Sequence, residues 1–391
     1  MTAQTVIFRN GRIFDGSQLH DGAAVRFSDG VLSGIVTAPE DDPGAYVIDL
    51  DGDILSPGYT DIQVNGGDGL MFNDAPTTDT LRRMAQAHRW LGVTHLLPTL
   101  ITDTRDITQG AIDAACAAVE EKIPGIAGLH LEGPHLSVAR KGAHDPALIR
   151  PMEADDLDLL LETAGKLPVL KVTIAPENVT EDQVTALARA GVLVSLGHTD
   201  ADFATCIRFF KAGARCATHL FNAMSQIGNR EPGLAGAALT YGEASAGLIA
   251  DGIHVHSDVI RIAWQSKQGP GKLFLVSDAM AVAGTDTDAF LLNGRSILRR
   301  DGQLRLSDGT LAGADLDLTK AVSVLVNQVG VPLDQALAAA TTTPAGLCRI
   351  PGCSLRPNAT RISEVIRIRQ DLSGLVQHTV DALGQPLADK V

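Results

Sequence analysis

The chain of 391 residues carries a formal net charge of −14 at pH 7, with 45% hydrophobic and 20% charged residues. This length exceeds one ordinary core, so we expect a large domain and a smaller one. The acidic balance argues against a nucleic-acid partner, whose phosphates require a basic surface. The sequence has no apolar stretch of the roughly 20 residues that a membrane span needs and no basic, apolar leader, so we expect a cytoplasmic protein without membrane contact.

The cysteines predict reduced thiols rather than a disulfide framework. They are odd in number, and none of them forms a Cys-x-x-Cys pair, which is usual for proteins of a reducing compartment. We expect small, buried apolar side chains at all five positions, which are Cys116, Cys206, Cys216, Cys348 and Cys353.

Both ends of the chain predict short β-strands. Near the start, four apolar runs lie at residues 6–8, 23–27, 31–36 and 46–50, separated by segments rich in Gly, Asp and Pro. Asp29-Gly30, between two of these runs, is a hairpin signal. Two further runs follow in the tail, at 364–368 and 375–380. We expect residues 1–55 and 346–391 to pair into one small β-sandwich domain.

The middle of the chain, residues 56–345, alternates apolar strands with amphipathic helices. Strand candidates lie at 59–64, 93–97, 126–131, 169–174, 192–196, 216–220, 246–250 and 273–277, and helices are expected at 80–91, 181–190 and 333–340. Eight such units over about 290 residues match a (β/α)8 barrel in number and size. Continuous apolar strands are typical of a parallel sheet buried on both faces. The expected fold class is therefore α/β, a TIM-like barrel with a small β-domain.

Four polar side chains stand at or just past the ends of these strand candidates, where a barrel gathers them around one mouth. Glu132, His198 and His219 are candidate metal ligands, because a carboxylate and two imidazoles suit a divalent ion and leave a position for water. Asp278 follows an apolar run, where an unpaired carboxylate is costly, and is the candidate general base and acid. The pattern predicts metal-assisted hydrolysis.

Each of these residues also has a structural interpretation. A single histidine at a strand end is more often a hydrogen-bonded structural residue than a ligand. Asp278 could instead cap a helix formed by the residues that follow it. Three candidate ligands at the ends of three different predicted strands favour the metal site over these alternatives.

Six short blocks follow one another along the barrel part of the chain. They are Leu-Glu-Gly-Pro at 131–134, Gly-His-Thr at 197–199, Thr-His-Leu-Phe-Asn-Ala-Met at 218–224, Asn-Arg-Glu-Pro-Gly-Leu-Ala-Gly at 229–236, Asp-Gly-Ile-His at 251–254 and Ser-Asp-Ala at 277–279. Together they resemble the N-acetylglucosamine-6-phosphate deacetylase family of the amidohydrolase superfamily. The resemblance extends from about residue 56 to residue 345, and the block at 229–236 is specific.

The resemblance implies one divalent metal ion per subunit, bound by the three candidate ligands, with Asp278 transferring the proton. Zinc is the first expectation, and iron or manganese are alternatives. Many amidohydrolases place His-x-His at the end of the first barrel strand and hold two metals, whereas this chain has Gln-Val-Asn at 63–65. Amides are poor ligands for a transition metal, so a single ion is expected, and Gln63 could orient the metal-bound water.

The resemblance also implies a pocket for an amino-sugar phosphate. His144 would contact the substrate and polarise its acetyl carbonyl. Arg230, which can come from the neighbouring subunit of a homodimer, would hold the phosphate, because its planar fork matches phosphate oxygens. The remaining implied contacts are Ala143, Asn222, Ala223, Asp251, Gly252, Ile253, His254, Leu311, Ala312 and Gly313.

Two further histidines are ambiguous. His135 stands where the family usually has a large aromatic or apolar residue, and we expect a supporting or structural role rather than a spare metal ligand. His256 lies two residues after His254, and we expect it to face solvent or to be structural.

The leading hypothesis is hydrolysis of N-acetyl-D-glucosamine 6-phosphate to D-glucosamine 6-phosphate and acetate, in amino-sugar catabolism or cell-wall recycling. The alternative is another amidohydrolase acting on a related N-acetylated sugar phosphate or on a cyclic amide, and Arg230 with Asn222 favours a phosphate. A catalytically inactive scaffold is a third hypothesis, which the complete set of ligands and proton-transfer candidate disfavours.

Overall fold

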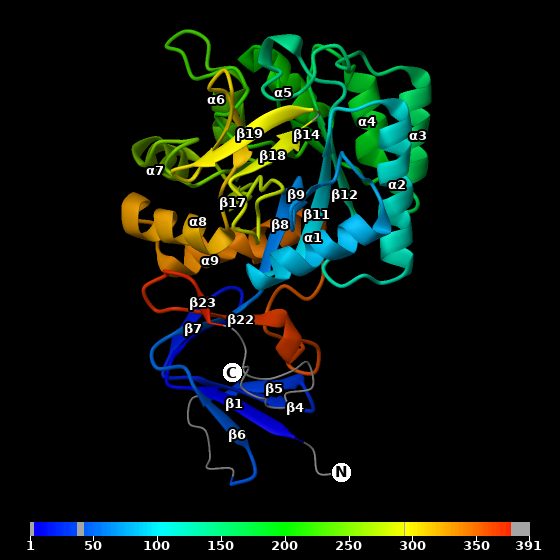
Figure 1. Cartoon of the computed structure of the whole chain (residues 1–391). Helices are drawn as coiled ribbons and strands as arrows, with labels where there is room; N and C mark the ends of the chain where they lie inside the picture. Colours follow the sequence, from blue (N-terminus) through cyan, green and yellow to red (C-terminus); the bar gives the residue numbers. More distant parts are fainter. Residues whose placement is uncertain (1–3, 37–42, 293, 377–391) are drawn as a thin grey trace.

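The structure, a computed structural model, describes residues 4–36, 43–292 and 294–376. Its larger part is a ring of parallel strands with helices on the outside, and smaller β-sheets lie below that ring (Figure 1). The smaller sheets contain strands from both ends of the chain. This confirms the predicted fold class, a TIM-like barrel with a small β-domain.

Eight parallel strands form the barrel in chain order. They are β8 (Tyr59–Val64), β11 (Val93–Ile101), β12 (Leu129–Glu132), β13 (Leu170–Ile174), β14 (Leu193–Leu196), β15 (Cys216–Ala217), β16 (Ser245–Leu248) and β17 (Leu273–Leu275). The ring closes where Val64 bridges Ala279 and the amide of Asp278 donates to the carbonyl of Gln63 at 3.1 Å. The eight predicted strands are confirmed, and β8 is buried along its whole length, as a strand covered on both faces must be.

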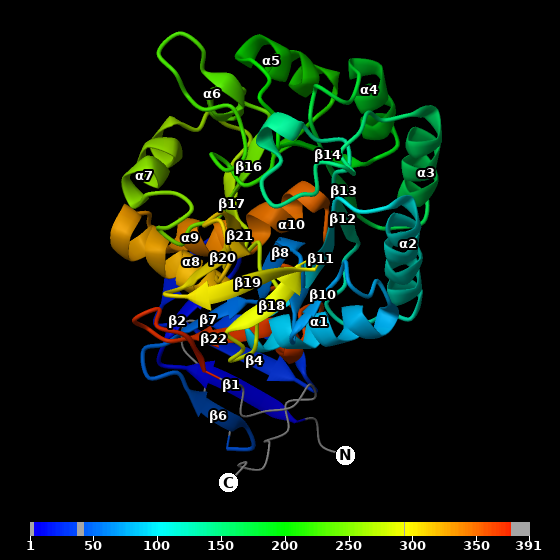
Figure 2. The same cartoon turned by 45° about the horizontal axis from the view of Figure 1, so that its top comes forward.

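Helices surround these strands, as the tilted view shows for α2 to α7 (Figure 2). The α-helices are α1 (Thr78–Trp90), α2 (Arg105–Glu120), α3 (Ala154–Ala164), α4 (Glu181–Arg189), α5 (Phe203–Ala212), α6 (Gly233–Thr240), α7 (Ser257–Ser266), α8 (Leu318–Val324), α9 (Leu333–Ala340) and α10 (Thr342–Cys348), with a π-helical turn at Leu325–Val329 and 3-10 turns at Val138–Arg140 and Ile362–Glu364. The predicted helices correspond to α1, α4 and α9. Thr77 and Thr180 begin α1 and α4 by accepting an amide three residues further on. Of the described helices, none is both long and apolar enough to cross a bilayer.

Two sheets form the small β-domain, which we call the β-module. One has the order β5–β4–β1–β6 and the other β23–β22–β7–β2–β3. The strands are β1 (Thr5–Arg9), β2 (Arg12–Phe14), β3 (Leu19–Asp21), β4 (Ala24–Ser28), β5 (Val31–Val36), β6 (Tyr46–Asp49), β7 (Ile54–Pro57), β22 (Val365–Ile368) and β23 (Leu375–Val376). Asp29 and Gly30 turn between β4 and β5 with φ of 50° and 75°, as the hairpin signal predicts. Residues 377–380 of the predicted strand at 375–380 lie outside the described residues.

The chain ends meet in one core of the β-module. Phe8 and Phe27 from the start of the chain pack in the same apolar cluster as Ile362 and Val365 from the tail. β22 pairs antiparallel with β7, directly before the chain enters the barrel at β8. The tail strand therefore fastens the β-module to the base of the barrel.

An antiparallel sheet that the sequence did not predict follows β17. This insert sheet consists of β18 (Ala289–Leu292), β19 (Arg295–Arg300), β20 (Gln303–Leu306) and β21 (Leu311–Ala314), in that order. A separate small hairpin of β9 (Gly66–Gly67) and β10 (Leu70–Met71) follows β8 in the chain. Ala314 bridges Ala279, which ties the insert sheet to the carboxyl end of the barrel. Its apolar face packs on Met71 and Met280. The insert sheet thus lies against the mouth where the candidate residues are found.

Candidate active site

The candidate residues stand at the carboxyl ends of four barrel strands. Glu132 ends β12, and His198, His219 and Asp278 follow β14, β15 and β17 within a few residues. The backbone at these last three is left-handed, with φ of 48°, 29° and 50°. Residues other than glycine rarely adopt this conformation, and such strain clusters at functional sites. The left-handed backbone follows the end of each regular strand, and the residues that adopt it are the ones whose polar side chains are buried in the site.

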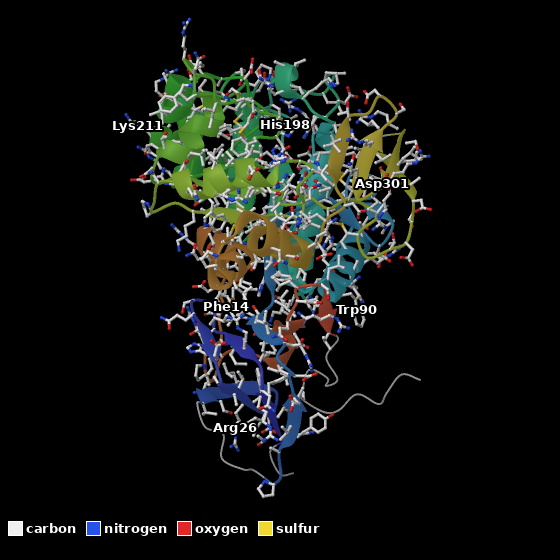
Figure 3. The ribbon with its side chains drawn as sticks, turned by 90° about the vertical axis from the view of Figure 1, so that its left-hand side faces the viewer. Phe14, Arg26, Trp90, His198, Lys211 and Asp301 are labelled. Carbon is white, nitrogen blue, oxygen red and sulfur yellow. The ribbon has the colours of Figure 1, made fainter. Side chains whose placement is uncertain are left out.

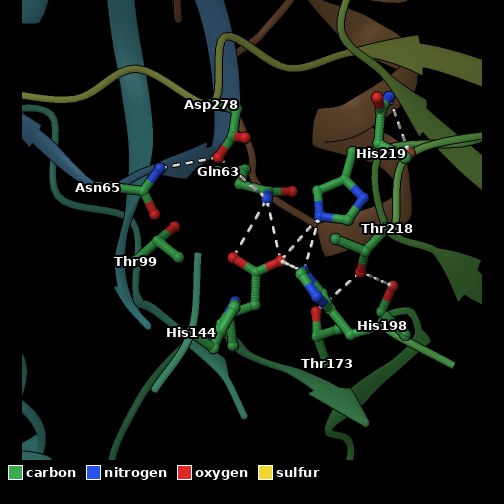
Figure 4. Close-up of polar contacts among 12 residues, drawn as sticks. Gln63, Asn65, Thr99, His144, Thr173, His198, Thr218, His219 and Asp278 are labelled. Atoms are coloured by element: carbon green, nitrogen blue, oxygen red, sulfur yellow. Dashed lines mark hydrogen bonds and ion pairs between the residues drawn. The ribbon is translucent and has the colours of Figure 1, made fainter. Parts of the chain in front are cut away.

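His198 and His219 lie side by side (Figure 4), and both contact the Glu132 carboxylate. The two Nε2 atoms lie 3.1 Å apart, and they lie 3.2 and 3.1 Å from Glu132 Oε1. All three side chains are buried. His198 Nδ1 lies 2.8 Å from the carbonyl oxygen of Arg140, which can only accept, so Nδ1 carries the proton of the neutral ring. The Nε2 lone pair of His198 therefore faces the cluster.

Three such atoms in mutual contact fit a metal ion. Ligand atoms about 2.0–2.1 Å from a tetrahedral zinc lie roughly 3.3 Å from one another, close to the three separations in this cluster. Two imidazoles and a carboxylate also form a donor set that borderline divalent ions accept. The buried carboxylate would otherwise lack a full counter-charge. Glu132, His198 and His219 can therefore hold one divalent metal.

Asp278 lies beside this cluster and is held by two amides. Asn65 Nδ2 donates to Asp278 Oδ1 at 2.7 Å, and Gln63 Nε2 donates to the same oxygen at 3.2 Å (Figure 4). Gln63 Nε2 also lies 3.3 Å from Glu132 Oε1, so one amide joins two carboxylates. Burial, and then the Glu132 carboxylate, raises the pKa of Asp278. A carboxyl group shifted in this direction accepts a proton more readily.

Thr102 fixes the tautomer of His144. The backbone amide of Thr102 donates to His144 Nδ1 at 3.3 Å, so Nδ1 is an acceptor and the ring proton is on Nε2. The Thr102 hydroxyl lies 2.8 Å from the same Nδ1. Burial, and then the neighbouring His198, lowers the pKa of His144 to about 3, which keeps the ring neutral. His144 therefore offers an N–H donor rather than a charge.

A cavity of about 550 Å³ lies next to these groups, within the size range of small-molecule sites. The predicted residues that line it are Glu132, Ala143, His144, His198, His219, Asn222, Ala223, His254, Asp278, Leu311 and Gly313. Gln63 is fully buried and lies behind Glu132 and Asp278 rather than in the cavity wall.

Five predicted contacts do not line this cavity: Arg230, Asp251, Gly252, Ile253 and Ala312. Asp251 instead supports its neighbour, because Oδ2 lies 2.6 Å from His254 Nδ1 and Oδ1 accepts the amides of Ile253 and His254 at 2.8 Å. Arg230 is exposed on the surface. Arg230 therefore does not line the cavity of its own chain, and its predicted phosphate contact stays a prediction.

The lining residues that the sequence did not single out come partly from the insert sheet and the 138–142 turn. They are Asn65, Ile101, Ala139, Arg140, Gly142, Ile249, Met280, Leu292, Arg305, Gly309 and Thr310. Gly142 has φ of 56°, and a Cβ there would lie 3.3 Å from His198 Cε1, so a glycine permits this close approach. At Gly313, a Cβ would lie 2.4 Å from Met280 Sδ. Both glycines were signals that a backbone passes close to the site.

The ambiguous histidines have structural roles. His135 is buried, and its Nδ1 lies 3.1 Å from the carbonyl oxygen of Arg150, outside the metal cluster. His256 is 73% exposed in its side chain and caps α7 through the amide of Asp258. The five cysteines are unpaired, as predicted, and four of them are buried while Cys116 is half-buried.

Comparison with known proteins shows which family shares this sequence and fold. Residues 54–353 match the Amidohydrolase family. The chain is 40% identical over 351 residues to the N-acetylgalactosamine-6-phosphate deacetylase of Shewanella sp. (strain ANA-3), covering 88% of each. It is 34% identical over 325 residues to the N-acetylglucosamine-6-phosphate deacetylase of Haemophilus influenzae, covering 82% of this chain and 84% of that protein. The crystal structure of the N-acetylglucosamine-6-phosphate deacetylase from Pasteurella multocida superposes with a TM-score of 0.90 at 31% identity, covering 98% of this chain and all of that one.

Proposed function

Since this chain belongs to the amidohydrolase family, and within it to the N-acetylglucosamine- and N-acetylgalactosamine-6-phosphate deacetylases, we propose that it hydrolyses N-acetyl-D-glucosamine 6-phosphate to D-glucosamine 6-phosphate and acetate. The observation that carries the proposal is the meeting of Glu132, His198 and His219 within 4.8 Å of one another, beside the buried Asp278. These are the groups that metal-assisted amide hydrolysis requires.

The three ligands would hold one divalent ion per subunit, zinc before iron or manganese. Such an ion acts as a Lewis acid and makes water a nucleophile near neutral pH. The nitrogen and oxygen donors support zinc without excluding the other two metals. Metal content measured on gently purified protein, together with acetate release after loading with each ion, tests this choice.

The protein's own residues account for the proton transfers. Asp278 would take the proton of the attacking water and deliver it to the sugar nitrogen as the bond between that nitrogen and the acetyl carbon breaks. The amides of Gln63 and Asn65 hold the Asp278 carboxylate for both steps. The Nε2–H of His144 would donate to the acetyl oxygen, where negative charge develops. Water supplies two protons: Asp278 carries the first to the sugar nitrogen, and the second leaves the acetyl hydroxyl group as acetate forms and ends on the amine. The products are acetate and the ammonium form of the amino sugar, so atoms and charges balance.

Substrate binding would use the residues around the cavity. Asn222, Ala223 and His254 line it together with Leu311 and Gly313. Asp251 would act through His254, whose ring it holds. Gly252, Ile253 and Ala312 would shape the walls from behind.

We propose that Arg230 reaches the phosphate from a second copy of the chain in a homodimer. Its exposure on one protomer supports this arrangement, because an exposed arginine is free to enter a neighbour's cavity. A cytoplasmic location is proposed with it, supported by five unpaired cysteines. Sedimentation of the native protein, and of an Arg230→Ala variant, tests the dimer and its role separately.

The galactosamine epimer is a second candidate substrate. The specific support is the 40% identity with the Shewanella protein, which is named for N-acetylgalactosamine 6-phosphate. The two sugars differ only in the configuration at carbon 4, so the same acetamide chemistry serves both.

Acetate release tests the proposed function. Metal-loaded protein should release acetate from N-acetylglucosamine 6-phosphate, from its galactosamine epimer, or from both, and turn over the unphosphorylated sugars more slowly. An Asp278→Asn variant is the matched control. Acetate release no faster than that control on every acetylated sugar phosphate would contradict the proposal.

A further inference from the structure

Lys171 is a charged side chain sealed inside the barrel. It lies on β13 and is only 1% exposed, and it is among the largest fully buried side chains of the protein. Lysine is almost never fully buried unless it is paired. Within the described part of the chain, no carboxylate lies within 4.0 Å of its ammonium group. The catalytic steps proposed above do not use it.

The ammonium group of Lys171 faces the strand that carries Gln63. Its Nζ donates to the carbonyl oxygen of Ile62 at 3.4 Å and to Gln63 Oε1 at 3.5 Å, and both acceptors belong to β8. The opposite end of the same amide, Gln63 Nε2, lies between Glu132 and Asp278 at 3.2 to 3.4 Å. Gln63 therefore connects the buried lysine to a metal ligand and to the proton-transfer residue.

These neighbours define which way the Gln63 amide points. An ammonium group has donors only, so it requires the amide oxygen, and carboxylates accept only, so they require the amide NH2. Without the lysine, the carbonyl end of the amide would lose its donor inside the barrel, where an unsatisfied polar atom is costly. Lys171 thus favours the one orientation that serves both carboxylates.

The charge of Lys171 also acts at this depth of the barrel. Its neighbour across the strand pair is His130, whose ring nitrogens lie 3.1 Å from the Thr99 hydroxyl and 2.8 Å from the Thr173 hydroxyl. The Gln63 amide connects the Lys171 ammonium group to Glu132 and Asp278, and in a dry interior a charge acts over a longer distance than in water.

We propose that Lys171 is a positioning residue of the active site. It orients the Gln63 amide and supplies the interior positive charge that this amide connects to Glu132 and Asp278, so that the ligand and the proton-transfer carboxylate are held in register. This inference rests on the proposed function for its kinetic test, and a second readout without substrate is independent of it.

A double-mutant cycle tests whether Lys171 acts through Gln63. The variants are Lys171→Met, Gln63→Met and the double variant, each loaded with metal; methionine approximates the length of both side chains and removes their polar groups. We expect Lys171→Met to lower kcat on the order of tenfold to a hundredfold, as loss of support behind a metal ligand does, with KM nearly unchanged. In the Gln63→Met background the lysine substitution should have little further effect.

The substrate-free readout is the visible absorption spectrum of the cobalt(II)-loaded protein. Lys171→Met should change this spectrum while one ion remains bound, because the Glu132 carboxylate loses its fixed amide partner. If wild-type protein releases no acetate, the proposed function fails while this readout still decides the role of Lys171. Where the methionine variant does not fold, Lys171→Gln, which keeps an N–H donor without the charge, replaces it in the cycle and in the spectrum.

The matched control is Lys267→Met. The Lys267 ammonium also donates to backbone carbonyls, those of Tyr241 and Gln268, but it lies after α7 and does not line the cavity. Its kcat and cobalt spectrum should equal those of the wild type. The inference is overturned if Lys171 variants keep wild-type kcat and spectrum, or if their loss of kcat is equally large in the Gln63→Met background.

Discussion

The two ends of the barrel each carry a cavity, and the cavities differ in chemistry rather than in size. At the carboxyl ends of the strands, about 550 Å³ is lined by Glu132, Asp278 and histidines. At the amino end, about 650 Å³ lies between α1, the start of β11 and β22, with Trp90 in its wall. His198 and Trp90 mark the two ends, which lie far apart along the barrel (Figure 3). The larger space is not the one with converging reactive groups.

The charges at the two ends are organised in opposite ways. In the amino-end cavity, Arg82 pairs with Glu121 at 3.0 Å and Arg367 pairs with Asp53 at 2.6 Å, so these two arginines have ordinary carboxylate partners. At the carboxyl end, two carboxylates lie buried on either side of one amide, next to left-handed backbone. Functional ends of proteins carry such unfavourable features because other regions supply the stability. Cavity volume alone would have identified the wrong end.

The largest effect expected at the carboxyl end is loss of the metal. Removing it with a chelator should reduce acetate release to background, because the nucleophile is then water at its ordinary pKa of about 15.7. Added zinc should restore the rate with about one ion per chain. If elemental analysis shows that the metal is completely removed and the activity survives, the carboxyl end does not depend on a metal site for catalysis, and this difference between the two ends is contradicted.

Asp278→Asn should have the next largest effect. The amide cannot accept the proton of water, and general acid–base groups contribute typically 10²–10⁴-fold. We expect kcat to fall within that range while metal content and thermal unfolding stay close to wild type. A variant that retains more than about a tenth of wild-type kcat would remove Asp278 from the proton transfers.

Much of the carboxyl end could be predicted because barrel geometry converts sequence position into spatial position. The runs before Glu132, His198 and His219 are apolar, so the strand ends were visible. The lengths were less accurate: the strand predicted at 216–220 ends at Ala217, because the backbone turns left-handed at His219. Such a left-handed residue, which ends a strand early and places a side chain in the site, leaves no trace in the pattern of apolar residues.

The insert sheet could not be predicted for a different reason. Its strands β18 and β19 alternate exposed and half-buried residues with few buried ones, which gives a weak pattern. The buried residues, such as Ile297 and Leu304, pack on Met280 and Met71 rather than in the main core. Such a sheet depends on tertiary contacts, and its cavity residue Arg305 was missed with it. Arg230 shows a different limit of the sequence, because a motif names a residue without saying whose cavity it serves, and the Arg230 contact stays a prediction.

Asp61 offers a test of stability cost below the active site. Its carboxylate accepts hydrogen bonds from the backbone N–H groups of Gln63 and Ser277, each at 3.2 Å, where β8 meets the segment that follows β17 and the barrel closes. Burial raises the pKa of Asp61 from 3.8 to about 7. The folded protein therefore holds this proton more tightly than the unfolded chain does. Stability is lost as pH rises from about 4 through about 7, by up to about 4 kcal/mol in total.

Asp61→Asn removes this titration. The free energy of unfolding of wild-type protein, relative to the variant, should therefore be lower at pH 8 than at pH 5, by a few kcal/mol at most. Urea unfolding of both proteins at both pH values measures it, and taking the difference between them cancels the pH dependence of metal binding. If the free energy of unfolding changes equally with pH in the two proteins, ionisation of the buried Asp61 does not lower the stability of the folded protein.

The smallest effect is expected at the opposite cavity. Trp90 is 56% exposed and lines the amino-end space, where no candidate ligand or proton-transfer residue is found among the lining residues. Trp90→Ala should leave kcat and KM within about twofold of wild type and change stability by no more than about 0.5–1 kcal/mol, as substitutions at exposed positions usually do. A KM change comparable to that of a cavity-lining variant such as His254→Ala would mean that this end takes part in catalysis. The functional region would then include the amino end of the barrel as well as the carboxyl end, although the buried carboxylates lie only at the carboxyl end.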